Sequence, residues 1–385
     1  MPGVIKERLF TPGPTPLLME AQARAMVANV HHRTEAFRQI MRETLDLLKY
    51  YFNTQNDVLI LASSGSGAME GAVTNLVSPG ERVLVGTAGK FGERWLGLAD
   101  AYGIEAVKVE APYGHPLRIE EIKERLEKDG PFRAVYIQAT ETSTAVSHDV
   151  KALGEIVRAY PGTCLVVDAI TGLGTTELSP DEWGLDIVIG GSQKAVMIAP
   201  GLAFVSVSEK AWKMIANAKL PRYYFDFAKE RKNQAKGETS YTPATTLIIS
   251  LHSALQYIKR IGRENLIANA ALLAEATREA SKALGLKLFA VSFPANAATA
   301  VCAPEGMDSG AIVKEMRSRF GAVIANGQGS MKGKIFRLAH LGYYDIPELF
   351  AVVAALELVL LKLGQKVELG NGVRAAQEVY LRRSG

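Results

Sequence analysis

CLVVDAITGLG, residues 164–174, and DIVIGGSQKAV, residues 186–196, are two apolar runs that each lead into a glycine-containing turn. Runs this apolar are typical of strands covered on both faces, as in parallel sheets. Open α/β sheets bind ligands at the carboxyl ends of their strands. We therefore expect Asp168 and Lys194 to lie at one ligand-binding edge of a mostly parallel sheet.

Similar runs precede and follow this pair and alternate with amphipathic helical stretches such as 119–128 and 150–159. The further strand candidates are DVLILA (57–62), RVLVG (82–86), EAVKVE (105–110), AVYIQA (134–139) and AFVSVS (203–208). This alternation predicts a doubly wound α/β domain with helices on both faces of the sheet.

The second half of the chain has a different pattern. A basic stretch at 229–237 is followed by a helical pattern at 245–262, which we interpret as a long connecting helix. The rest predicts a smaller α+β domain. Its expected helices are 265–284, 309–320 and 347–363, and its expected strands are 286–291, 298–303 and 335–339. We divide the chain into an N-terminal segment near the active site (1–20), a large domain (21–262) and a small domain (263–385).

Composition excludes several classes of protein. The 385 residues are 48% hydrophobic and 22% charged, with a net charge of +4 and no basic run interleaved with aromatics, so no nucleic-acid partner is expected. Cys164 and Cys302 cannot form a disulfide framework and lack metal-ligand spacing, so no metal is expected. The N-terminus has no signal-peptide pattern, and the apolar stretch 349–363 is too short to span a bilayer. These features predict a cytoplasmic protein without membrane contact.

The loop Ser63-Ser64-Gly65-Ser66-Gly67 follows a strand and precedes a helix. Small residues there let backbone amides and hydroxyls surround an anion at the helix N-terminus, which indicates a phosphate cradle. The alternative is a tight turn with a capping serine. It is not a Walker loop, because no Gly-Lys-Ser/Thr follows, and it lacks the third glycine of a dinucleotide fingerprint.

The conjunction of three features points to pyridoxal 5'-phosphate. Taken alone, Asp168 could cap a turn and Lys194 could be a solvated surface residue. Together with an anion loop at the same sheet edge, they suit a Schiff-base lysine and an acidic partner that keeps the cofactor's pyridine nitrogen protonated. Lys194 would also move the proton between substrate and cofactor carbons.

At this point the chain resembles the class V, fold-type I pyridoxal-phosphate aminotransferases, specifically the serine–pyruvate and alanine–glyoxylate group. The resemblance runs nearly end to end. It rests on TPGPTP (11–16), HHRTEAF (31–37), SSGSGAMEGA (63–72), GKFGERW (89–95), VDAITGLG (167–174), GGSQKA (190–195) and GKIFRLAHLG (333–342).

The resemblance implies roles for further residues. Ser64, Gly65, Ser66 and Gln193 would hold the cofactor phosphate, and Phe91 would stack on the pyridine ring where relatives often carry Trp. These assignments follow the matching motifs residue by residue. The alternative for Phe91 is a plain core phenylalanine.

The same resemblance places Thr142 near the cofactor's phenolic oxygen and Arg337 on the substrate α-carboxylate, which a planar guanidinium can fork. Gly13 would let the N-terminal backbone lie against the substrate. It also implies a homodimer in which Tyr241 and Thr242 of the neighbouring subunit complete the phosphate site. The chain departs from better-known members in that stretch.

His32 and Arg33 leave the substrate open. A His-Arg pair of this kind contacts the substrate phosphate in phosphoserine aminotransferases, which would favour an acidic or phosphorylated amino acid; the alternative is a loop or interface contact. Otherwise the resemblance implies ping-pong transfer from alanine or serine to a 2-oxo acid such as glyoxylate or pyruvate.

Three rival functions share parts of this pattern. A cysteine desulfurase needs a mobile-loop cysteine, whereas Cys164 and Cys302 both lie in apolar runs. A non-catalytic subunit could keep the fold, although it would not need Lys194, Asp168 and Arg337 together. A nucleotide-binding α/β protein would leave the lysine motif unexplained.

Overall fold

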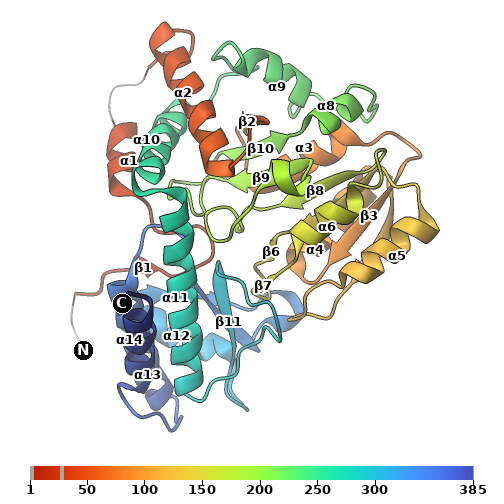
Figure 1. The fold of residues 1–385 in the computed structure, drawn as a ribbon. Helices are drawn as coiled ribbons and strands as arrows, with labels where there is room; N and C mark the ends of the chain where they lie inside the picture. The colour runs from red at the N-terminus through yellow and green to blue at the C-terminus, as the bar shows by residue number, and fades with distance from the viewer. Residues whose placement is uncertain (1–3, 27–29, 385) are drawn as a thin grey trace.

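The computed structural model describes residues 4–26 and 30–384, so residues 1–3 of the expected N-terminal segment lie outside it (Figure 1). Its large sheet has seven strands. In spatial order they are β2 (Asp57–Leu61), β10 (Ala203–Val207), β9 (Ile187–Gly191), β8 (Cys164–Asp168), β5 (Ala134–Gln138), β3 (Arg82–Thr87) and β4 (Glu105–Glu110). All neighbours are parallel except β10, which runs antiparallel to both β2 and β9. The predicted doubly wound α/β architecture is confirmed.

Helices cover both faces of this sheet. Strands β5, β8 and β9 are therefore buried at every position. One apolar core contains residues of α2 (Glu35–Phe52), α5 (Ile119–Asp129), α6 (Val150–Val157) and α10 (Thr245–Ile261). The core on the other face contains residues of α3 (Gly65–Leu76), α4 (Lys90–Ala101) and α8 (Glu209–Ile215). Short elements β6 (Thr140–Glu141), β7 (Val146–Ser147) and α7 (Pro180–Trp183) complete this part.

The basic stretch folds as a helix, α9 (Phe227–Gln234), which protects an edge of the large sheet. Gln234 Nε2 donates to the carbonyl of Ile60 on β2 (2.7 Å), and its Oε1 accepts from the amide of Ile60 (2.9 Å). An edge strand presents unpaired backbone groups, and this side chain satisfies them as a neighbouring strand would.

A second, antiparallel sheet consists of β11 (Ala298–Cys302), β14 (Ile335–Ala339) and β13 (Ala325–Asn326). Four helices surround it with their own apolar core. They are α11 (Arg263–Ala283), α12 (Ser309–Phe320), α13 (Ile346–Lys362) and α14 (Asn371–Ser384), with a 3-10 turn η1 (Gly329–Met331) between β13 and β14. Among the helices described, none has the length and apolarity to cross a membrane.

The strand predicted at 286–291 is wrong. In this segment only Leu288 forms a bridge, with Val301 of β11. Val291 is 68% exposed, so the alternation of apolar residues does not continue onto a buried face. The segment follows the edge of β11 without becoming a regular strand.

The N-terminal segment joins the two sheets. Its strand β1 (Arg8–Leu9) pairs in parallel with β12 (Ala322–Val323), and the amide of Ala339 donates to the carbonyl of Phe10 (3.0 Å). The amide of Leu18 then donates to the carbonyl of Met197 (2.8 Å), just before α1 (Met19–Ala25). Residues between these anchors therefore pass over the turn that carries Lys194.

Candidate functional site

A cavity of about 90 Å³ opens where β8 and β9 end and α3 begins. Its lining includes predicted residues from several loops, among them the serine loop and the turns that carry Asp168 and Lys194. Four further lining residues were missed by sequence reasoning: Arg94, Thr140, Ile170 and Thr171. The full lining is Ser64, Gly65, Ser66, Phe91, Arg94, Thr140, Thr142, Asp168, Ile170, Thr171, Gln193 and Lys194. Strand ends on one sheet edge thus converge, as the parallel topology requires.

Lys194 lies under the N-terminal segment. Its Nζ donates to the carbonyl of Pro12 (2.5 Å), and a Cβ on Gly13, whose φ is +147°, would collide with that Nζ. Burial lowers the pKa of Lys194 to about 8; the charge of Asp168 opposes this shift and that of Arg337 adds to it. A useful fraction of the amine is therefore neutral and nucleophilic near pH 7.

Asp168 closes β8 and is 6% exposed. Its Oδ1 accepts from the amide of Ile170 (2.9 Å), which fixes the carboxyl group. Burial raises the pKa of Asp168 to about 6, and the neighbouring charge of Glu141 adds to this shift. The group is still ionised at neutral pH and can pair with a cationic ring nitrogen.

Glu141 fixes the start of α4, and with it Phe91. Its buried carboxylate accepts from the amides of Phe91 (3.1 Å), Gly92 (3.0 Å) and Ser143 (3.1 Å). Burial raises the pKa of Glu141. Sequence reasoning did not select this residue, although a carboxylate among hydroxyl residues after a buried strand was a usable signal.

Two threonines line the cavity, and Arg337, which is not in its lining, lies behind one of them. Thr142 and Thr171 share a hydrogen bond between their Oγ1 atoms (2.6 Å). Arg337, 3% exposed, donates from Nη1 to the carbonyl of Thr142 and from Nη2 to that of Asn326, both at 2.9 Å. Burial lowers the pKa of Arg337 to about 10, so it is still cationic at neutral pH. Its buried Nε has no hydrogen-bond partner in the described chain, which leaves a donor for a ligand.

The lysine turn contains a second polar group without a partner. The Oε1 atom of Gln193 is buried and has no hydrogen-bond partner among the described residues. Arg94 lines the same cavity; it donates to Ser66 Oγ (2.9 Å), and its guanidinium lies 5.0 Å from the centre of the Phe91 ring. Helical spacing of three residues from Phe91 was the available signal for Arg94.

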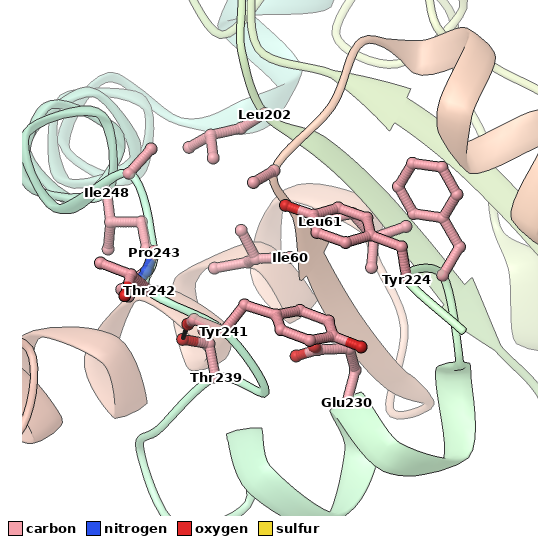
Figure 2. Close-up of a pocket in the computed structure, with 13 residues that line it drawn as sticks. Ile60, Leu61, Leu202, Tyr224, Glu230, Thr239, Tyr241, Thr242, Pro243 and Ile248 are labelled. Carbon is pink, nitrogen blue, oxygen red and sulfur yellow. Dashed lines mark hydrogen bonds between the residues drawn. The ribbon is translucent and has the colours of Figure 1, made fainter.

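Tyr241 and Thr242 lie elsewhere in this chain. They line a separate, mostly apolar pocket of about 30 Å³, with Ile248 and Tyr224 on opposite sides of it in Figure 2. The Tyr241 ring stacks on Tyr224 at 4.9 Å, and its hydroxyl donates to the carbonyl of Tyr223 (2.8 Å). Neither residue lines the cavity around Lys194.

The remaining predicted residues are also outside that cavity. His32 and Arg33 precede α2; the rings of His31 and His32 stack at 4.7 Å, and Arg33 is exposed. Cys164 is buried in β8 and Cys302 lies in β11, so neither cysteine is placed for a desulfurase reaction at Lys194.

Comparison with known proteins gives a consistent picture. Residues 17–340 match the family described as aminotransferase class-V. A soluble hydrogenase small subunit from Synechococcus is 42% identical, covering 97% of this chain and 98% of its own. A serine–glyoxylate aminotransferase from Methylorubrum extorquens is 33% identical (98% and 97% covered). The crystal structure of a Thermus thermophilus aspartate aminotransferase of subgroup IV is similar with a TM-score of 0.86 at 34% identity, covering 92% of this chain and 99% of that one.

Proposed function

Because the chain belongs to the class-V aminotransferase family, we propose that it binds pyridoxal 5'-phosphate and moves the amino group of a small amino acid, alanine or serine, to a 2-oxo acid such as glyoxylate or pyruvate. One observation carries the proposal. Lys194, a half-buried lysine whose pKa is about 8, and Asp168, a buried carboxylate, line the same cavity as a serine loop at a helix N-terminus.

The donors present fit this cofactor, because the cavity combines hydroxyls, the amide group of Gln193 and the N-terminus of α3. Gly65 packs so closely on Ile170 that a Cβ there would collide with it. Ser64, Gly65, Ser66 and Gln193 would hold the phosphate, and Phe91 would cover one face of the ring. Asp168 would pair with the ring nitrogen. Thr142 would face the phenolic oxygen.

When bound, the cofactor would supply an aldehyde that takes up the amino group and a ring that accepts electrons from the substrate's α-carbon. Lys194 would form the covalent link and then carry the α-proton as general base. The ionised Asp168 would keep the ring nitrogen charged. Arg337 would bind the substrate α-carboxylate through its free Nε–H, which a buried cation can do strongly. Gly13 leaves space beside Lys194 Nζ.

The named relatives differ in amino donor, since one is a serine–glyoxylate and another an aspartate aminotransferase. We favour a small donor because the cavity is small and His32 and Arg33 do not line it. An acidic or phosphorylated donor is the second candidate, for which those two residues would have to come from a neighbouring subunit. The relative named as a hydrogenase subunit raises a third, a non-catalytic role, against which the assembled Lys194, Asp168 and Arg337 weigh.

A homodimer with shared sites is part of the proposal. Ser64 and Arg94 at the cavity are exposed in the single chain, and so are Tyr223 (77%) and Tyr224 (46%) beside Tyr241. Water must be excluded from a site of this chemistry. A second copy that brought Tyr241 and Thr242 to the cavity would cover both surfaces. We also keep the predicted cytoplasmic location.

The test is an absorbance spectrum of the purified protein beside Lys194→Ala, each scanned before and after single amino acids are added anaerobically. Exposed Lys213→Ala serves as the matched control. We expect a visible band in the wild type and control that Lys194→Ala lacks, and one amino acid should convert it to the spectrum of the aminated cofactor, which names the donor. A wild type that stays colourless after added pyridoxal phosphate would refute the cofactor assignment.

A further inference from the structure

Arg94 has a position that the predicted roles leave unexplained. It lies on α4, one helical turn after Phe91, and its side chain turns back to the cavity. There its guanidinium contacts the Phe91 ring at 5.0 Å and donates to Ser66 Oγ at 2.9 Å. One side chain thus touches both the aromatic wall and the serine loop.

The charge of Arg94 is not matched by these two contacts. A phenyl ring and a hydroxyl are neutral, and a cation held by such partners is still available to an anion. Its charge reaches the centre of the site, because it opposes the rise in the pKa of Asp168 and adds to the fall in the pKa of Lys194. Arg94 is therefore within electrostatic reach of whatever fills the cavity.

The anion expected there needs more charge than the loop supplies. A phosphate monoester carries about −1.5 to −2 at neutral pH. The N-terminus of a helix such as α3 provides the equivalent of about +0.5. Ser64, Ser66 and Gln193 add neutral groups only. A full positive charge beside the loop would bring the site close to balance, and Arg94, which lines the cavity and contacts Ser66, can supply it.

We propose that Arg94 is the cationic ligand of the cofactor's phosphate. The inference rests on the proposed function, since it assumes pyridoxal phosphate in this cavity. The guanidinium would bind the phosphate oxygens from the α4 side of the cavity. The fork geometry suits this task better than a lysine would, because it can hold the anion and Ser66 together.

The test separates the phosphate from the rest of the cofactor. Cofactor-free protein is titrated with pyridoxal phosphate and, separately, with pyridoxal, which has the same ring and aldehyde but no phosphate. Binding is followed by absorbance for the wild type, Arg94→Ala, Arg94→Lys and the control Arg125→Ala. Arg125 lies on α5, pairs with Asp129 and is outside the cavity.

We expect Arg94→Ala to weaken binding of pyridoxal phosphate about 10- to 100-fold, as for the loss of a charge-assisted hydrogen bond. Binding of pyridoxal should change less than about threefold, and Arg94→Lys should lie between wild type and Arg94→Ala. Inorganic phosphate should compete with pyridoxal phosphate in the wild type and much less in Arg94→Ala.

Two outcomes would overturn the inference. If Arg94→Ala weakened the binding of pyridoxal phosphate and of pyridoxal equally, Arg94 would support the Phe91 ring or the fold and not the phosphate. If the binding of neither compound were weakened, Arg94 would have no role in the site. A wild type that binds neither compound would instead count against the proposed function itself, so the two failures are distinguishable. Circular dichroism and thermal melting of each variant show whether it is folded.

Discussion

The floor of the cavity and the loop at Tyr241–Thr242 differ in how complete they are within one chain. The floor is complete: Asp168 is buried, Lys194 is half-buried, and Lys194 Nζ donates a hydrogen bond to the backbone carbonyl of Pro12. The loop lines another pocket, beside the exposed Tyr223 and Tyr224. We infer that the large sheet places Asp168 and Lys194 correctly within one chain, whereas a second copy would be needed to complete the outer wall of the cavity.

The largest expected effect on activity comes from replacing Arg337, the residue proposed to bind the substrate carboxylate. Arg337→Leu should lower kcat/KM for the amino acid by about 30-fold to several thousand-fold, because losing one partner of a buried charge pair costs roughly 2–5 kcal/mol. Steady-state kinetics with Arg125→Leu as control measure this. Unchanged kinetics would remove Arg337 from the site.

Mixing subunits tests the unfinished region. Thr242→Ala should bind pyridoxal phosphate about 10-fold more weakly, since a hydrogen bond to a charged group is lost. If sites are shared, a hybrid with Lys194→Ala carries one intact site, made of one chain's Lys194 and the other's Thr242. Equal mixing should then restore about a quarter of wild-type activity at limiting cofactor by random pairing. No recovery in an exchange-competent mixture would argue for sites within single chains.

The pH dependence sharpens the electrostatic account of the floor. Lys194 must be neutral to attack an aldehyde, so the rate of cofactor uptake should rise by about tenfold per pH unit below 8 and level off above it. The charge of Arg337 lowers the pKa of Lys194, whereas that of Asp168 raises it. Arg337→Leu should therefore move the midpoint to higher pH and Asp168→Asn to lower pH. Stopped-flow absorbance measures both, and a shift in the opposite direction would contradict this account.

The smallest effect is expected at Arg33, which lies outside the cavity. Arg33→Ala should change kcat/KM for alanine or serine by less than about twofold, in the range of exposed ion contacts. The same variant assayed with aspartate and phosphoserine decides the second candidate. A loss of more than about tenfold confined to those acidic donors would favour it.

Much of the large sheet could be predicted because its strands are runs of Val, Ile and Leu with helices between them. The carboxyl ends of parallel strands meet at one edge of the sheet, so the sequence alone predicts that Asp168 and Lys194 lie close together. The reversed direction of β10 was not predicted, because an apolar run such as 203–208 has the same pattern in either direction.

Other features escaped because they depend on contacts between distant segments. Glu141 and Arg94 are ordinary charged residues in the sequence, and their importance follows from three backbone amides and one aromatic ring that the fold brings to them. α14 and the helix in the basic stretch were not predicted, since polar residues dominate both and the apolar positions are few. The irregular segment 286–291 shows the converse error.

The N-terminal segment has a consequence for how the enzyme is made. Pro12 and Gly13 lie between Phe10 and Leu18, which are held by Val323, Ala339 and Met197. These three partners leave the ribosome much later than the N-terminal segment. Chain growth at about 5–20 residues per second separates these events by many seconds. The large sheet can form while translation continues. The N-terminal segment between Phe10 and Leu18 cannot take its final place over Lys194 until Val323 and Ala339 have been made. Binding of the proposed cofactor in the completed site should therefore follow translation. A ribosome-bound chain that ends before Val323 should not show this binding.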